Sequence, residues 1–246
     1  YPENVKWYLS YDLTTKDASG EYHNYSKEMM KKWFVENESR SFNLIFNSME
    51  DAYAAIETYK AAIMSDGEEE IAENISMTPQ PQISLVIMDQ SNGHVVAIVG
   101  GRGAKEGSRT LNRATDSARQ PGSTFKVLST YAPALDSAGM TLATVFNDAP
   151  FNYNDGTPVH NWYSNPPYEG LSSIRKGIYH SMNIVTVKCL TQITPKLGFD
   201  YLEDFGFTTL NELNDCYQPM ALGGVGGVTN LELCAAYATI ANGGVY

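Results

Sequence analysis

Two apolar runs of strand length, separated by five turn-forming residues, most strongly limit the folds that this chain can adopt. The first run, residues 83–88, reads Ile-Ser-Leu-Val-Ile-Met, and the second, residues 94–99, reads His-Val-Val-Ala-Ile-Val. The linker between them reads Asp-Gln-Ser-Asn-Gly, and these residue types favour reversal of the chain. Residues 83–99 are therefore predicted to form a β-hairpin.

Most other segments carry helical signals. Ser48 is placed to cap a helix over residues 49–64, and Thr229 begins a Thr-Asn-Leu-Glu capping box that opens another helix near the end of the chain. Residues 125–135 continue directly from a Pro-Gly turn and are predicted to be helical, as is the apolar stretch 184–193.

The chain is predicted to have two parts. Residues 1–78 are polar, rich in tyrosine and expected to be mainly helical, so we interpret them as an N-terminal linker or pedestal. Residues 79–246 begin with the two strands and continue into the helical block. Strands followed by helices indicate the α+β class, with an antiparallel sheet flanked by helices, rather than alternating parallel units.

Composition excludes several classes of function. Hydrophobic residues make up 43% of the chain and charged residues 18%, which is enough to bury a core. The net charge of −11 argues against nucleic acid or an anionic membrane surface as a partner. The three cysteines and four histidines are scattered without metal-ligand spacing, so neither a metal nor another cofactor is expected.

Residues 122–126, Gly-Ser-Thr-Phe-Lys, contain a serine and a lysine at a spacing suited to acyl transfer. On a helix Ser123 and Lys126 share a face, so the lysine amine can lie beside the serine hydroxyl. A poorly hydrated lysine loses its preference for the charged form and can act as a base. The same spacing recurs at Ser173 and Lys176, where a helix cap and a solvated lysine explain it. Spacing alone therefore does not single out Ser123.

Several ordered blocks resemble the transpeptidase domain of class A penicillin-binding proteins. Residues 119–126, Arg-Gln-Pro-Gly-Ser-Thr-Phe-Lys, look like the active-site signature of that family, and residues 181–183, Ser-Met-Asn, resemble its second motif, Ser-x-Asn. Other blocks are similar to further parts of the same domain: residues 99–103, 111–115, 221–224 and 237–244. The resemblance implies the fold shared by penicillin-binding transpeptidases and serine β-lactamases.

The resemblance also implies a role for each matching residue. Ser123 would attack the penultimate D-alanine of a peptidoglycan stem peptide ending in D-Ala-D-Ala, and Lys126 would take the serine proton. Ser181 would relay a proton to the departing amine, while the amide of Asn183 would hold Lys126 and the substrate backbone. β-Lactams would imitate the D-Ala-D-Ala end and remain covalently attached to Ser123.

Three further residues are expected to bind substrate. Gly122 and Thr124 flank the serine, and Asn165 lies in a proline-rich loop over residues 147–170 that precedes the second motif. Aromatic side chains of that loop are open to two interpretations, as a lining of the substrate groove or as packing anchors. They are Trp162, Tyr163 and Tyr168.

The third family motif, Lys-Thr/Ser-Gly on a strand beside the cleft, does not occur in the sequence. We therefore expect a partial transpeptidase domain with an incomplete sheet and doubtful activity by itself. Its remainder would lie in a second chain of a cleaved protein or in a further stretch of the same one. The resemblance also implies a membrane anchor and a glycosyltransferase domain before Tyr1, and a location on the extracytoplasmic face of the bacterial cell membrane.

Two other functions remain open on sequence grounds. A serine β-lactamase uses the same Ser-x-x-Lys and Ser-x-Asn residues but needs a second base for rapid deacylation, and no glutamate in a matching pattern supplies one. A non-catalytic penicillin-sensing module would keep the fold, yet it has no need of a base beside a serine.

Overall fold

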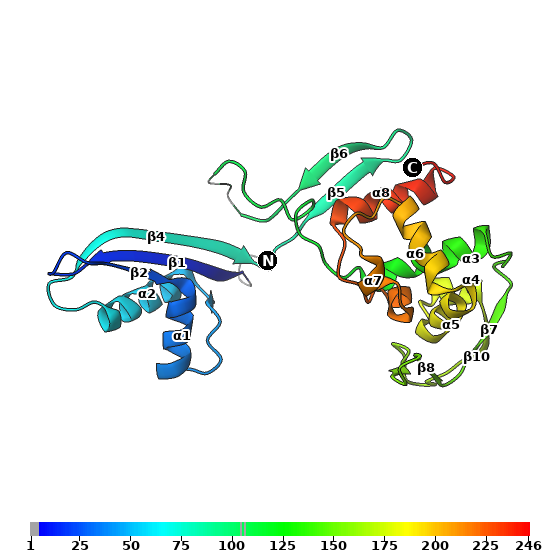
Figure 1. The fold of residues 1–246 in the computed structure, drawn as a ribbon, viewed down its shortest axis with the longest axis horizontal. Helices are drawn as coiled ribbons and strands as arrows, with labels where there is room; N and C mark the ends of the chain where they lie inside the picture. The colour runs from blue at the N-terminus through cyan, green and yellow to red at the C-terminus, as the bar shows by residue number, and fades with distance from the viewer. Residues whose placement is uncertain (1–4, 104, 106) are drawn as a thin grey trace. The chain divides into compact units, whose positions relative to one another are not determined.

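The computed structural model describes residues 5–103, 105 and 107–246, and the chain divides into two compact units (Figure 1). The first unit consists of residues 1–83 and 101–110, and the second of residues 84–100 and 111–246. Within the described ranges, no helix combines the length and the apolar character needed to cross a bilayer.

The first unit is a four-stranded antiparallel sheet with two helices, drawn from blue to cyan in Figure 1. Strand β1 (Lys6–Lys16) is central and pairs along its whole length with β4 (Glu69–Gln80). Its other edge pairs first with β3 (Ile45–Phe46) and then with β2 (Tyr22–Ser26). The helices are α1 (Lys27–Asn37) and α2 (Met49–Ile63).

The prediction that residues 1–78 are mainly helical is wrong, because the longest strands of the chain lie there or begin there. Leu9, Tyr11 and Leu13 alternate along β1 and are buried in a cluster with residues of α1 and α2 such as Phe34. This period of two is the pattern of a half-buried strand. The polar and tyrosine-rich composition concealed it, since Tyr11 serves here as a core residue.

The second unit begins with the predicted hairpin, which is confirmed. Strands β5 (Leu85–Asp89) and β6 (His94–Val99) pair antiparallel, and within the described ranges each pairs only with the other. Helix α8 (Asn230–Ala241) packs on β5. Apolar side chains of both strands are nevertheless exposed, among them Ile87 and Val96.

The helical block of the second unit surrounds one hydrophobic core. A continuous helical stretch starts as the 3₁₀ turn η2 (Gly122–Thr124), passes through the π-helical segment η3 (Val127–Tyr131) and ends as α3 (Ala132–Asp136). Against it packs α5 (Asn183–Ile193), which is buried on almost every side. The other helices are α4 (Ile174–Tyr179), α6 (Pro195–Asp204), α7 (Glu212–Asp215) and the 3₁₀ turn η4 (Gln218–Leu222).

The segment between α3 and α4 contains two small antiparallel ladders. Strand β7 (Val145–Asp148) pairs with β10 (Gly170–Ser173), and β8 (Phe151–Asn152) pairs with β9 (Pro158–Val159). All strand pairs in the described ranges are antiparallel and helices pack beside them, which confirms the α+β prediction.

The predicted helix starts at Ser48 and Thr229 are also confirmed. The Ser48 hydroxyl accepts the N–H of Asp51. Thr229 accepts the N–H of Glu232, whose carboxylate in turn accepts the N–H of Thr229, so both halves of a capping box are formed at α8.

Replacing Thr229 should therefore lower the stability of the second unit, because the N-terminus of α8 loses its cap. We expect Thr229→Ala to lower the free energy of unfolding by about 1 kcal/mol, the typical cost of losing an N-cap hydroxyl. Thr229→Ser keeps the hydroxyl and should retain most of that free energy. Urea unfolding of both variants measures the difference, and equal stabilities for the two would show that the cap contributes nothing.

Candidate active site

The turn that carries Ser123 is built by a close approach of two chain segments. Gly122 has φ +59°, a conformation that favours glycine, and it opens the helical stretch in which Ser123 is exposed. A Cβ on Gly223 would lie 2.4 Å from the backbone nitrogen of Gly122. The end of η4 therefore packs directly on the turn: a side chain at Gly223 would collide with the backbone of Gly122, and one at Gly122 would strain the backbone before Ser123.

Three residues further on, Lys126 is buried, with 3% of its surface exposed. Its Nζ donates hydrogen bonds to the backbone oxygen of Ser181 at 2.6 Å, to Ser181 Oγ at 3.0 Å and to Asn183 Oδ1 at 2.5 Å. All three acceptors are neutral. Burial lowers the pKa of Lys126 from 10.5 to about 8, because the charged form loses hydration without gaining a counter-charge from these partners.

Ser181 lies in a strained turn between two helices. It has φ +50°, which is uncommon for a residue with a side chain and costs on the order of 1 kcal/mol or more. Its N–H donates to Ile178 O at 3.2 Å, and the N–H of buried Met182 donates to Gly177 O at 3.0 Å. This turn directs both the carbonyl and the hydroxyl of Ser181 toward the Lys126 amine.

Asn183 is the first residue of α5, and its neighbours fix the orientation of its side chain. Its Oδ1 accepts from Lys126, and its Nδ2 donates to His160 O at 2.7 Å. Only one assignment of the amide oxygen and nitrogen satisfies both contacts, because an ammonium can only donate and a carbonyl oxygen can only accept.

The structure thus brings Lys126 into direct contact with Ser181 and Asn183, and we call these three residues the Lys126 group. Ser123 lies one helical turn before Lys126, at the surface. Within the described ranges, no hydrogen bond joins Ser123 to Lys126. The amine instead uses its hydrogen bonds on the second motif, where Ser181 Oγ is the nearest hydroxyl that can exchange a proton with it.

The three residues expected to bind substrate have different surroundings. Gly122 forms the turn, and Thr124 Oγ1 donates to Pro121 O at 2.6 Å, so both support the serine through the backbone. Asn165 is exposed, precedes a cis peptide bond to Pro166, and makes no hydrogen bond to the Lys126 group within the described ranges.

The loop residue that does reach the group is Asn161, which sequence reasoning missed. Its Oδ1 accepts the N–H groups of Asn183 at 3.0 Å and Ile184 at 3.3 Å. No local pattern could have indicated this contact, because its partners lie more than twenty residues away. The neighbouring aromatics make structural contacts: the Tyr163 hydroxyl donates to Asp148, and the indole of Trp162, although 66% exposed, donates to His180 O at 2.9 Å.

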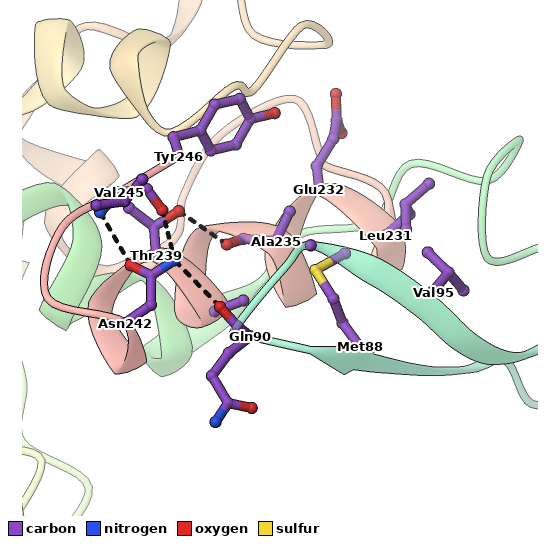
Figure 2. Close-up of a pocket in the computed structure, with 12 residues that line it drawn as sticks. Met88, Gln90, Val95, Leu231, Glu232, Ala235, Thr239, Asn242, Val245 and Tyr246 are labelled. Atoms are coloured by element: carbon purple, nitrogen blue, oxygen red, sulfur yellow. Dashed lines mark hydrogen bonds between the residues drawn. The ribbon is translucent and has the colours of Figure 1, made fainter.

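A cavity of about 430 Å³ lies elsewhere in the second unit, between the β5–β6 hairpin and α8. Figure 2 shows its mainly apolar lining, which includes Met88, Val95 and Ala235. None of its lining residues belongs to the Lys126 group, and the serine–lysine chemistry lies outside it.

In the part of the chain that the structure describes, no group of three or more histidine, cysteine, aspartate or glutamate side chains is arranged to hold a metal ion.

Comparison with known families shows which proteins the chain resembles. The family described as "Penicillin binding protein transpeptidase domain" matches residues 83–246. Penicillin-binding protein 1A of Clostridium tetani is 34% identical over 177 residues, which cover 67% of this chain and 22% of the relative. The proteins of the same name from Escherichia coli and Neisseria cinerea are 33% and 39% identical over 173 residues, covering 69% and 68% of this chain and 20% of each relative. The chain thus spans about a fifth of the length of these relatives.

Solved structures show the same likeness. The crystal structure of penicillin-binding protein 1A from Haemophilus influenzae aligns over 95% of this chain and 33% of its own, with a TM-score of 0.59 and 25% sequence identity. The penicillin-binding protein PonA1 from Mycobacterium tuberculosis aligns over 66% of this chain and 43% of its own, with a TM-score of 0.54 and 20% identity. The second likeness concerns the fold alone.

The unusual environment of Lys126 has a direct test. We expect its side chain, followed by the ¹³Cε chemical shift, to titrate near pH 8 rather than near 10.5. Lys196 is the internal control, because the hydrogen bonds that it donates, first to Asp200 and then to Glu212, raise its pKa. Since the folded chain releases the Lys126 proton before the unfolded chain does, this group should also make the free energy of unfolding rise between about pH 8 and 10.5. A normal titration midpoint for Lys126 would contradict the buried site.

Proposed function

This chain belongs to the penicillin-binding protein transpeptidase family, and on that premise we propose that it cross-links peptidoglycan through an acyl-enzyme on Ser123. The observation that carries the proposal is the buried Lys126 amine held by Ser181 and Asn183. Three side chains from two distant segments meet there with the donors and acceptors that serine acyl transfer needs.

The first step forms an ester on Ser123. The serine oxygen attacks the carbonyl carbon of the penultimate D-alanine while its proton passes to the neutral amine of Lys126. The lowered pKa serves this role, because a shift from 10.5 to about 8 raises the neutral fraction at pH 7 about 300-fold. Exposed Ser123 is open to a peptide substrate, whereas Lys126 remains shielded from water.

Release of the terminal D-alanine requires a proton on its amine. Ser181 Oγ, 3.0 Å from Lys126 Nζ, is placed to pass this proton on while it receives another from the lysine. The amine of a second stem peptide then attacks the carbonyl carbon of the Ser123 ester and gives a proton to the neutral Lys126 amine. As the cross-linking amide forms, the ester bond to Ser123 breaks, and Lys126 passes that proton to the serine oxygen. Asn183 keeps the amine in place throughout, because its own amide is anchored on His160.

Substrate binding and location belong to the same proposal. Gly122 and Thr124 would keep the peptide backbone beside the serine, and Asn165 would contact it from the loop. We assign residues 79–246 to the transpeptidase domain and residues 1–78 to a linker or pedestal. Because the proposed substrate is peptidoglycan, the reaction would take place on the extracytoplasmic face of the bacterial cell membrane. A membrane anchor and a glycosyltransferase domain are expected in the whole protein.

Covalent labelling by a penicillin tests the nucleophile. We expect the natural full-length protein to gain the mass of one drug molecule, because a β-lactam carbonyl would acylate Ser123 and remain bound as an ester. Ser123→Ala should abolish the gain. Intact mass spectrometry provides the measurement, and the lifetime of the adduct separates the functions: an adduct stable for hours indicates a transpeptidase, and rapid loss indicates a β-lactamase.

Ser173→Ala is the matched control, since Ser173 and Lys176 repeat the same spacing. Its hydroxyl caps α4, so the variant should lose about 1 kcal/mol of stability and keep full labelling. A protein that labels equally with and without Ser123, or a folded full-length protein that takes no drug, would contradict the proposed function.

A further inference from the structure

Asp148 is a buried carboxylate that is linked to Asn183 through Asn161. It is the last residue of β7, 1% of its surface is exposed, and both of its oxygens accept hydrogen bonds. Oδ1 accepts from Asn161 Nδ2 at 2.8 Å, and Oδ2 accepts from the Tyr163 hydroxyl at 2.7 Å and the N–H of Glu169 at 2.8 Å. Three donors converge on this side chain, so each of its two oxygens has at least one hydrogen-bond partner.

These donors are themselves fixed. Burial and then the hydrogen bond to Asp148 raise the pKa of the Tyr163 hydroxyl, so it keeps its proton and donates it to the carboxylate. The N–H of Glu169 is a backbone donor without alternatives. The side of Asp148 that faces Tyr163 must therefore present an oxygen, which leaves the other oxygen for Asn161.

Asn161 transmits this arrangement to α5. Its Nδ2 donates to Asp148 and, at 3.3 Å, to Pro167 O, while its Oδ1 accepts the first two N–H groups of the helix, those of Asn183 and Ile184. Helix N-termini leave such N–H groups without partners inside the helix. Because the Asp148 carboxylate can accept a hydrogen bond only from the amino end of the Asn161 amide, the oxygen end of that amide must face α5.

The same loop also holds the side chain of Asn183. His160, the neighbour of Asn161, accepts from Asn183 Nδ2 at 2.7 Å, which leaves Asn183 Oδ1 for Lys126 Nζ. The backbone and the side chain of Asn183 are thus set by two successive loop residues. Asn161 acts through its side chain, and Asp148 anchors that side chain.

We propose that Asp148 and Asn161 are positioning residues for acyl transfer, which hold Asn183 in the place where it meets Lys126. The inference rests on the proposed function of Ser123 and Lys126. Neither residue contacts the reacting atoms, so their effect is expected in the rate of acylation rather than in the affinity for the acyl donor. The competing explanation is that this network only stabilises the fold.

Exchanging donors and acceptors separates the two explanations. Asp148→Asn keeps the size of the side chain. Because the oxygen of the new amide must face the N–H of Glu169, its amino end faces Asn161 Nδ2, and two N–H donors then oppose each other. If Asn161 rotates to relieve them, its own amino end meets the N–H groups of α5. The double change Asp148→Asn with Asn161→Asp restores a donor–acceptor pair at each of these contacts, and only the 3.3 Å contact to Pro167 O is lost.

Asp215→Asn is the matched control. Asp215 is likewise a buried carboxylate, 4% exposed, and it accepts the N–H of Gly226 at 2.7 Å and that of Asn211 at 2.8 Å. It is the last residue of α7 and makes none of the contacts around Asn183 within the described ranges. The variant should therefore lower the melting temperature without affecting the Lys126 group.

The experiment uses the natural full-length protein and a fluorescent penicillin, with the noncovalent dissociation constant and the acylation rate constant measured separately. We expect Asp148→Asn to lower the acylation rate constant about 10-fold or more, with the dissociation constant changed by less than about 2-fold. Hydrogen exchange at the amides of Asn183 and Ile184 should accelerate in the same variant. The double change should restore the rate constant and the exchange protection, and Asp215→Asn should alter neither.

Two results would overturn the inference: an acylation loss that Asp215→Asn reproduces, or an Asp148→Asn defect that the double change leaves uncorrected. A protein that binds no penicillin covalently in any form would contradict the proposed function instead. In that case exchange at the Asn183 amide still tests whether Asp148 and Asn161 hold the start of α5, because that measurement does not require acylation.

Discussion

The buried amine of Lys126 is the interaction on which the candidate site depends. A lysine that loses its hydration is costly unless hydrogen bonds replace the lost water, and here all three go to neutral oxygens of Ser181 and Asn183. A carboxylate partner would have raised the pKa of the amine, as one does for Lys176 beside Glu169. Neutral acceptors hold the amine in place and keep its pKa low enough for it to act as a base.

The rest of the second unit can be understood as support for this contact. The Gly223 backbone fixes the turn before Ser123, and the strained turn at Ser181 aims two oxygens at the amine. Asp148 and Asn161 then determine where α5 begins. The contact of Gly223 with Gly122 and that of Ser181 with Lys126 join segments that are distant in the chain, so the site depends on tertiary packing.

Local signals in the sequence predicted those elements whose structure depends on neighbouring residues. The hairpin β5–β6 and the capping box at Thr229 depend on neighbouring residues, and both are confirmed. The sequence signal of strand β1 is weak, because one of its alternating buried residues is Tyr11, a residue type that occurs both in cores and at surfaces. Asp148 and Asn161 carry no local signal either, since their roles depend on contacts with loops and a helix that only the tertiary fold brings near. The grouping of Lys126 with Ser181 and Asn183 was expected from the family resemblance rather than from spacing.

Exchange of D-alanine tests the central claim most directly, because it follows the chemistry on the peptide itself. The natural full-length protein is incubated with a stem peptide ending in D-Ala-D-Ala and with isotopically labelled D-alanine, and the peptide is analysed by mass spectrometry. If Ser123 forms an acyl-enzyme at the penultimate residue, labelled D-alanine will replace the terminal one, and Ser123→Ala will show no replacement. A folded protein that leaves the peptide unlabelled, or one that exchanges D-alanine equally well without Ser123, would contradict the account.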